Sequence, residues 1–373
     1  MGWLWWALPS QWRDAGVAVD AATAITASLA IPWALKFVWA PLVDVLRGRW
    51  FGYRGWLMVA QLGMAATLLP LLAIDPVRQW QSVGGLLLAH AFFAATQDVA
   101  IDGLAVASVP DGERGDLNGA MQAGMITGRL VFSTGLLRAE SLLDVRVAVP
   151  GLLTVLGLAL VLVACSRVTE PAMQRGPSLG PRRRRYLAAL VRAPRIWRLA
   201  AFALFGGIGF EAAGALLGSW LVDRGLSPAE AGDFRFVTAL LMIGGALVGG
   251  RLADRRGARG TAVRQALLLV LLLLLVAVLD AVRADAVAMV VFAAVYFGIG
   301  GFTAASYALF MQHANGPLAA TLFSAFMGLT NGCEALSARL AGLLQVAYGY
   351  PVAIALPALL SLPALLLLLR RRR

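Results

Sequence analysis

The chain has 373 residues, of which 60% are hydrophobic and 14% charged, and its mean hydropathy is +0.77. Soluble domains carry about 25% charged residues and about half apolar ones. This composition therefore excludes an ordinary soluble fold and a large extramembrane enzyme domain. At about 20 apolar residues per membrane-spanning helix, the length allows about eleven or twelve spans joined by short loops.

Runs of mainly apolar residues predict eleven membrane-spanning helices. In chain order they cover 17–41, 56–74, 83–108, 117–137, 147–166, 196–222, 236–253, 262–280, 286–312, 318–344 and 350–369. Transmembrane β-strands would alternate apolar and polar residues, whereas runs such as Leu267–Leu275 do not alternate. The expected fold class is an all-α polytopic membrane protein.

The arginines are unevenly divided between alternate loops. Twenty-two of them lie in one set of connections: 44–55, 109–116, 167–198, 251–264 and the tail 370–373. The other loops together carry seven arginines and nine acidic residues. Because the excess of basic residues marks cytoplasmic loops, we expect the first set, including the C-terminus, in the cytoplasm. The net charge of +12 is then an orientation signal on an anionic lipid leaflet, and a nucleic-acid partner is not needed to explain it.

A polar, basic segment divides the predicted helices into two groups. Residues 1–166 form a predicted N-terminal transmembrane bundle, 167–195 a basic cytoplasmic linker, and 196–373 a C-terminal transmembrane bundle. Five spans precede the linker and six follow it, so a match between the halves requires one more helix at the start. We expect the first helix to be largely missing, either because the true start lies upstream or because that helix is truncated.

A short pattern repeats between the two halves. Asp44, followed by Arg54, comes just after the first predicted span, and Asp254, followed by Arg255, comes just after another span, 210 residues further along the chain. Two six-helix bundles related by a parallel repeat are one of the known transporter architectures. The pattern therefore predicts a two-bundle fold.

Three stretches then resemble a known family: Pro32–Asp44, Ala95–Gly103 and Glu113–Gly115. They are similar to the muropeptide-permease (AmpG-like) branch of the major facilitator superfamily. The siderophore permeases of the RhtX/FptX type and the acetyl-CoA transporters belong to the same neighbourhood. In the second half, the resemblance continues through Asn315 with the Thr-x-Phe-Ser pattern at 321–324, and through Glu211. It implies a solute carrier of the bacterial inner membrane.

The sequence also departs from that family. The pocket-lining residues of the family's first helix are absent, and Phe205–Phe210 lacks the basic residue that many relatives carry before the acid of the seventh helix. Because of these two departures, the resemblance by itself does not imply that this chain shares the family's coupling mechanism or its transport activity.

Charged residues inside membrane helices are costly unless paired, so they mark ion or substrate paths. Asp98 and Asp102 are four residues apart and share one helix face, where two carboxylates disfavour simultaneous ionisation, so one could hold a proton. Arg129 is a candidate counter-ion for this pair or a ligand for a substrate anion. A static network that locks two helices together is the alternative. Glu211 is a further candidate proton carrier.

The repeated Asp and Arg residues form the candidate cytoplasmic gate. In the superfamily, an Asp at a helix end and Arg in the following loop hold the cytoplasmic side shut, which implies such a role for Asp44, Arg54, Asp254 and Arg255. Lys36 belongs to the same family motif, and its long side chain could extend its ammonium to the cytoplasmic interface. A purely topological role of these charges is the alternative.

Uncharged polar groups inside the spans are the candidates for substrate contact. They are Gln97, Asn118, Gln122, Asn315, Thr321 and Ser324, with Trp33, Trp39 and Tyr307 as possible stacking surfaces.

The expected function is proton-coupled import of a small solute by alternating access, with the protein a monomer in the lipid bilayer. Anhydromuropeptide is the first substrate hypothesis and a siderophore the second, because Asp102–Val106 and Asn118 are nearer to the siderophore permeases. A non-transporting membrane receptor or a membrane enzyme is the alternative of another class. We expect no enzyme activity, no cofactor and no metal, since the sequence contains neither a Gly-x-x-x-x-Gly-Lys-Ser/Thr phosphate-binding motif nor a Cys/His/Asp catalytic grouping.

Overall fold

A computed structural model describes residues 8, 12, 15–17, 19–46, 52–75, 77–131, 145–166, 188–189, 192–314, 316 and 318–369, and every regular element in these ranges is helical. The α-helices are α2 (Val19–Val45), α3 (Tyr53–Leu68), α4 (Trp80–Ser108), α5 (Arg114–Leu130), α7 (Val145–Cys165), α9 (Pro194–Phe205), α10 (Ile208–Val222), α11 (Pro228–Arg256), α12 (Ala258–Ala281), α13 (Asp285–His313), α14 (Ala319–Leu360) and α15 (Leu362–Leu369). Two short 3-10 turns, η2 (Leu69–Leu72) and η3 (Asp111–Glu113), complete the set. The all-helical prediction is confirmed for the described residues.

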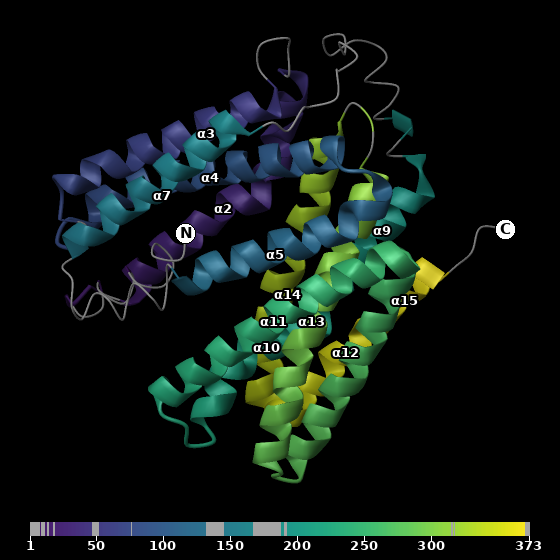
Figure 1. Ribbon diagram of the computed structural model, residues 1–373. Helices are drawn as coiled ribbons and strands as arrows, with labels where there is room; N and C mark the ends of the chain where they lie inside the picture. Colours follow the sequence, from purple (N-terminus) through teal and green to yellow (C-terminus); the bar gives the residue numbers. More distant parts are fainter. Residues whose placement is uncertain are drawn as a thin grey trace. The chain divides into compact units, whose positions relative to one another are not determined.

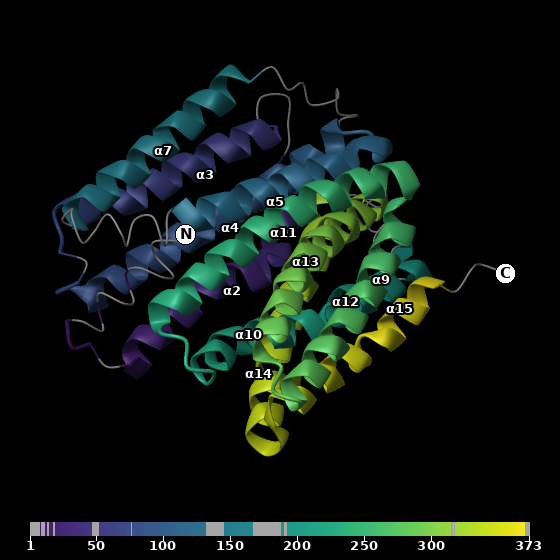
Figure 2. The ribbon, with the colours of Figure 1, turned by 60° about the horizontal axis from the view of Figure 1, so that its bottom comes forward.

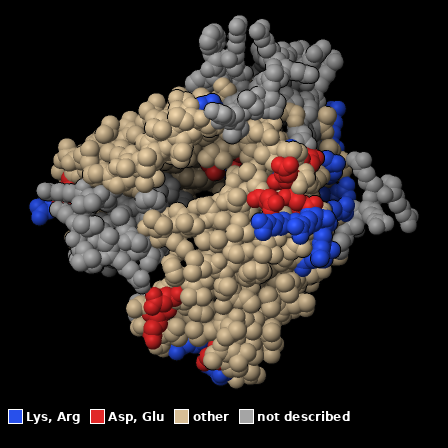
Figure 3. All heavy atoms as spheres, viewed as in Figure 1, with Lys and Arg blue, Asp and Glu red and all other residues tan. Residues whose placement is uncertain are grey.

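Many of these helices have the length and composition of membrane spans. Among the described residues, eight helical segments are long and apolar enough to cross a bilayer. Large apolar side chains such as Leu162, Leu271 and Val290 are 71%, 65% and 70% exposed, which suits contact with lipid rather than water. In Figure 3, the charged side chains gather in a few groups and broad uncharged faces lie between them. The exact number of eleven spans stays a prediction, and the start of the chain and the linker lie largely outside the described residues.

Glycines interrupt one predicted span and kink one helix of the structure. The predicted helix 196–222 is broken at Gly206 and Gly207, which separate α9 from α10. Consecutive glycines have the lowest helix propensity of the non-proline residues, so a break is least costly there. Near the other end, α14 is kinked at Gly349, whose φ of 78° is a left-handed value that favours glycine. This kink falls in the predicted boundary between 318–344 and 350–369.

The described chain forms two compact units. The first comprises 1–108, 127–179 and 315–325, and the second comprises 109–126, 180–314 and 326–373. Helices α5 and α14 therefore each begin in one unit and continue in the other. The predicted division into 1–166, 167–195 and 196–373 stays a prediction.

In the first unit, α4 packs against α2 and α3, and α3 also packs against α7 (Figure 1). Its apolar core brings together one buried residue from each helix in turn: Leu29, Leu68, Leu87 and Val149. These side chains come from segments up to 120 positions apart, and their packing holds α2 and α4 side by side.

In the second unit, α13 packs against both α11 and α12 (Figure 2). The approach of α11 to α13 depends on small residues, because a Cβ on Gly245 would fall on the Phe297 backbone and one on Gly249 would fall on Gly301. Small residues at helix interfaces let backbones approach closely in membranes. Helix α13 is thus closely packed between α11 and α12, and several of its side chains line a pocket described below.

Candidate functional site

A buried cation lies between two carboxylates in the first unit. The ammonium of Lys36 in α2 is 2.5 Å from Asp98 Oδ2 and 3.1 Å from Asp102 Oδ2, both in α4. The Lys36 and Asp102 side chains are 2% and 6% exposed, whereas that of Asp98 is 40% exposed. With all three groups ionised, the cluster carries one net negative charge, and a single proton makes it neutral.

Neighbouring contacts position this cluster. One helical turn from Lys36, Trp39 Nε1 donates a hydrogen bond of 3.2 Å to Thr96 Oγ1, and the Trp39 and Phe92 rings lie 4.9 Å apart. These contacts join α2 to α4 directly beside the charges. The Oε1 atom of Gln97 is buried and has no hydrogen-bond partner among the described residues. An acceptor without a partner next to Asp98 is available to a donor on a solute.

The structure changes the interpretation of Lys36. The prediction that the Lys36 ammonium extends to the cytoplasmic interface is wrong, because this side chain is buried against Asp98 and Asp102. Sequence reasoning missed the contact, although Lys36 is the single lysine of the chain and lies in an apolar run. Arg129 lies in the last turn of α5 with an exposed side chain, and its roles as counter-ion or substrate ligand stay predictions.

The first gate candidate, Asp44, binds the start of α14. Asp44 is fully buried; its Oδ1 accepts a hydrogen bond of 2.7 Å from the Tyr53 hydroxyl. Its Oδ2 accepts bonds of 2.8 and 2.6 Å from the backbone N–H and the hydroxyl of Thr321. Gly103 makes room for this arrangement, since a Cβ there would fall on the Tyr53 ring. Ser324, one turn further along α14, is fully buried.

The second gate candidate, Asp254, binds the start of α5. Asp254 lies near the end of α11, and its two carboxylate oxygens accept hydrogen bonds of 2.7 Å each from the backbone N–H groups of Gly115 and Asp116. Carboxylates at helix N-termini satisfy N–H groups that have no partner in the helix and interact favourably with the helix dipole. Gly115 has to be small, because a Cβ there would fall on the carbonyl oxygen of Gly250.

The two gate arginines differ in their surroundings. Arg54 donates from Nε to the carbonyl of Val163 at 2.8 Å, and from its Nη2 to the carbonyl of Ala164, at the end of α7. Such a cation completes the last carbonyl groups of a helix. Arg255 is exposed in the last turn of α11. The predicted gate residues therefore contact three different helix ends: Asp44 the start of α14, Asp254 the start of α5, and Arg54 the end of α7.

Three polar residues of α5, Arg114, Asn118 and Gln122, lie buried in the second unit. Asn118 donates from Nδ2 to the Arg114 carbonyl at 2.6 Å and to the sulfur of Met311 at 3.2 Å. Arg114 in turn donates to the Met311 carbonyl at 2.8 Å. Burial lowers the pKa of Arg114, and the Asp111 carboxylate at 2.7 Å opposes that shift. Gln122, also buried, follows Asn118 by one turn. Asn315 lies outside the described residues.

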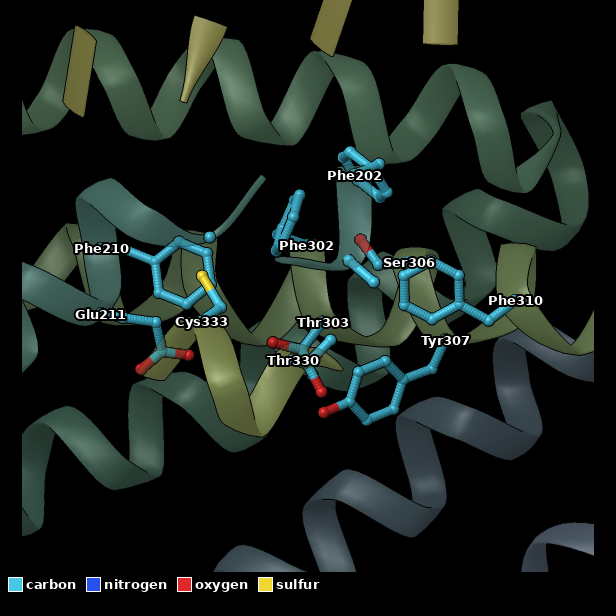
Figure 4. Close-up of a pocket in the computed structure, with 12 residues that line it drawn as sticks. Phe202, Phe210, Glu211, Phe302, Thr303, Ser306, Tyr307, Phe310, Thr330 and Cys333 are labelled. Carbon is cyan, nitrogen blue, oxygen red and sulfur yellow. The ribbon is translucent and has the colours of Figure 1, made fainter. Parts of the chain in front are cut away.

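A pocket opens between α9, α10, α13 and α14 of the second unit (Figure 4). Its lining includes Glu211, which lies in the first turn of α10 directly after the glycine break. Tyr307 from α13 lines the same pocket. The break was not expected from hydropathy, and it places Glu211 at a helix start, where the helix dipole is favourable for a carboxylate.

A comparison of the sequence with models of protein families identifies the family of this chain. The model of the Major Facilitator Superfamily matches residues 2–338. The chain belongs to the major facilitator superfamily. Members of this superfamily are multi-pass membrane transporters of small-molecule solutes, so the match indicates a transporter and not an enzyme. The expectation of the superfamily fold is confirmed.

Solved structures of superfamily members agree with this fold. FucP in the outward conformation aligns with a TM-score of 0.77 at 16% identity, covering all of this chain and 97% of that one. The human organic anion transporter MFSD10 aligns with a TM-score of 0.72 at 17% identity, covering 97% and 93% of the two chains. A bacterial homologue of the iron transporter ferroportin, in an outward-facing state, has a TM-score of 0.70 at 15% identity and covers 99% and 96%. At these identities the likeness shows the fold alone.

Among curated sequences, an uncharacterized protein of Haemophilus influenzae is 33% identical over 100 residues. The match covers 25% of this chain and 24% of that protein, so it spans about a quarter of the relative's length. For this member of the superfamily, solute and coupling ion have to be argued from its own residues.

Proposed function

We propose that the chain is a proton-coupled secondary transporter that imports a small solute across the bacterial inner membrane by alternating access. The observation that carries the proposal is the buried Lys36, Asp98 and Asp102 cluster. The arginine bias supports a cytoplasmic C-terminus, and the exposed apolar faces support direct contact with lipid. We expect the monomer to be the transporting unit, with no cofactor.

The charge balance of the cluster favours proton coupling. Two carboxylates around one ammonium leave a net negative charge, which is costly to bury at low dielectric. One proton removes that net charge. Asp98, at 40% exposed, gives protons a route in, while Asp102 and Lys36 are shielded. Proton binding thus changes the cost of burying the α2–α4 contact, which is what coupling to a conformational change requires.

The gate residues suggest what that conformational change breaks. Asp44 ties the first turn of α14 to the first unit, and Asp254 ties the first turn of α5 to the second. Charge-assisted hydrogen bonds of this kind are strong, yet they can be replaced by water when the helix start moves. We therefore assign Asp44 and Asp254 to the cytoplasmic gate, supported by Arg54 and Arg255.

The family motifs suggest the solute. The stretches Pro32–Asp44 and Ala95–Gly103 favour the AmpG-like branch, and anhydromuropeptide is therefore the first substrate hypothesis. A siderophore is the second, on the evidence of Asp102–Val106 and Asn118. Asn118 and Gln97 each have a buried oxygen without a partner among the described residues, which makes them the polar groups best suited to bind a solute.

Uptake into proteoliposomes tests the proposal. Purified protein is reconstituted, and entry of labelled anhydromuropeptide and of a ferric siderophore is measured with and without an inwardly directed proton gradient. We expect the gradient to accelerate uptake of one of them in the unaltered chain. The variant Asp98→Asn/Asp102→Asn should lose this acceleration while still exchanging solute across the membrane at equilibrium.

An exposed carboxylate of the same unit provides the control. Asp75 is half exposed near the outward loop, and Asp75→Asn should leave the acceleration unchanged. If the double variant responds to the gradient like the unaltered chain, the cluster is not the coupling site. If neither compound enters under any gradient, both substrate hypotheses are wrong, and a receptor on this scaffold becomes the better explanation.

A further inference from the structure

Two polar side chains of the second unit lie against a glycine face of α10. Gly214 and Gly218 are four residues apart and share that face. A Cβ on Gly218 would fall on the guanidinium of Arg235, which comes from α11. A Cβ on Gly214 would lie 3.6 Å from the hydroxyl oxygen of Tyr296, which comes from α13. The two glycines therefore leave room for Arg235 and Tyr296 to lie next to each other, about one helical turn apart along α10.

The helices that carry this pair are closely packed. Helix α11 packs against both α10 and α13 (Figure 2). The Tyr296 ring stacks on Phe292 with ring centroids 6.3 Å apart, and the Phe292 ring lies 5.4 Å from that of Trp220 in α10. Trp220 Nε1 in turn donates a hydrogen bond of 3.0 Å to the Asp280 carboxylate. These contacts fix the position of the Tyr296 ring, and a fixed position of the contacting groups is what a binding site requires.

Neither polar group of the pair has a hydrogen-bond partner among the described residues. Within that part of the chain, the Arg235 guanidinium makes no hydrogen bond and no ion pair, and the Tyr296 hydroxyl makes no hydrogen bond. Arg224 of the same unit is different, because its guanidinium binds two aspartates and the Trp220 carbonyl. A guanidinium carries five N–H donors, and a charge in a membrane helix is costly unless it is paired or hydrated. Arg235 thus has unused donors and no carboxylate to balance its charge.

The position of Arg235 makes it accessible from outside the protein. Its side chain is exposed, and it lies seven residues after Pro228, about 10 Å from the start of α11. Helix α11 follows a loop that lies on the outward side in the predicted orientation. A solute that enters from the outward side would therefore meet Arg235 before it reaches the middle of the membrane.

The charges around the pair indicate where an anion would bind. Tyr296 interacts electrostatically with both Arg235 and Glu211, and the effect of Arg235 is the larger. Glu211 comes three residues before Gly214 on α10, whereas Gly218 comes four residues after it. Along α10 the order is thus Glu211, Tyr296 and Arg235. An anion on Arg235 would have the Tyr296 hydroxyl between itself and the Glu211 carboxylate.

We propose that Arg235 and Tyr296 bind an anionic group of the solute, a carboxylate or a phosphate. The planar guanidinium can donate two parallel hydrogen bonds to either group, and the tyrosine hydroxyl adds a third donor. The inference deepens the proposed function and rests on it in one respect, because it takes the bound anion as part of the transported solute. Either substrate hypothesis then requires an acidic group of the solute to contact α11.

Chemical labelling of arginine tests the inference without requiring transport. The purified full-length protein in detergent is treated with phenylglyoxal, and mass spectrometry of its peptides measures the labelling rate of each arginine. The probes are N-acetylalaninate, inorganic phosphate and the neutral N-acetylalaninamide, at constant ionic strength set with chloride. We expect at least one of the two anions to slow the labelling of Arg235 at least about threefold, and the amide to leave it unchanged. Arg283, exposed in the turn between α12 and α13, is the internal control and should be labelled at the same rate throughout.

Two variants locate the bound anion. Tyr296→Phe keeps the stacked ring and removes the hydroxyl, so the anion concentration needed for protection should rise severalfold. Tyr348→Phe, at a tyrosine of α14 that is 68% exposed, is the matched control and should keep the protection. Gly218→Ala places a methyl group where the guanidinium lies, and it should also weaken protection, while thermal unfolding of the variant reports whether the fold is retained.

The outcomes separate this inference from the proposed function. Arg235 labelling that neither anion slows, or that the amide slows equally, overturns the inference even if proton-coupled uptake is observed. Protection by phosphatidylglycerol in mixed micelles, without protection by the soluble anions, assigns Arg235 to a lipid headgroup and overturns it as well. Protection by a soluble anion that weakens in Tyr296→Phe, in a protein without gradient-driven uptake, supports the site and overturns the proposed coupling.

Discussion

Replacing Lys36 with methionine removes the cation of the buried cluster while keeping an unbranched side chain of similar length. At an effective dielectric of about 20, the attraction across the 3.1 Å between Lys36 and Asp102 is about 5 kcal/mol, before desolvation is subtracted. Removing one partner of a buried ion pair costs about 3–5 kcal/mol, because the remaining charge stays buried. We therefore expect Lys36→Met to lower the free energy of unfolding by about 3–5 kcal/mol.

The second carboxylate makes the test sharper. In Lys36→Met/Asp102→Asn, one buried negative charge is removed with the cation, so most of the lost stability should return. The assay is unfolding in mixed detergent micelles by titration with sodium dodecyl sulfate, followed by tryptophan fluorescence, for both single variants and the double variant. Such a cycle isolates the interaction between the two residues.

An exposed pair serves as the control. Arg78 and Asp75 are 3.7 Å apart, with side chains 88% and 47% exposed, and Arg78→Met should change the free energy of unfolding by less than about 0.5 kcal/mol. The reasoning is refuted if the effects of Lys36→Met and Asp102→Asn simply add. Additivity would mean that the two charges do not interact in the folded protein.

Three further variants test other contacts. Arg224, 5% exposed and ion-paired with two aspartates, should cost about 3–5 kcal/mol when changed to methionine, and Arg224→Lys should not fully restore the stability measured by thermal unfolding. Gly115→Ala should lower stability by about 1–3 kcal/mol because α5 must move away from α11, whereas Gly124→Ala, with open space at its Cβ, should be neutral or stabilising in the same measurement. Asp44→Ala should speed maleimide labelling of a cysteine introduced at Ser324 severalfold in a background without native cysteines, and an unchanged rate would contradict the gate assignment.

Much of the fold was predictable because the bilayer constrains each segment separately. The run 262–280 predicts a span, and α12 covers Ala258–Ala281. In the hydrocarbon core of a bilayer, the backbone N–H and C=O groups of a long apolar run have no water to bind. They can all be hydrogen-bonded within the run only if it forms a helix. Hydropathy did not reveal the break at Gly206 and Gly207. Glycine weakens a helix, but it does not interrupt a run of apolar residues, so the hydropathy of 196–222 looks continuous.

The candidate site was predictable only in part. That Asp98 and Asp102 share a face follows from helix geometry, and the structure agrees because one ammonium contacts both. That Lys36 supplies this ammonium could not be derived, since a lysine in an apolar run can also extend to the interface. The partner of Asp44 was equally hidden, because Thr321 lies 277 positions away.

The same division runs through the whole protein. Helical class, the family motifs and the predicted orientation follow from the sequence, since hydropathy and arginine bias are properties of one segment in contact with lipid or water. Which charges neutralise one another, which helix starts are bound by Asp44 and Asp254, and which rings surround Glu211 depend on the packing of segments distant in the chain. Those pairings decide where a net charge can be buried, and therefore which few polar groups are left to bind a proton or a solute.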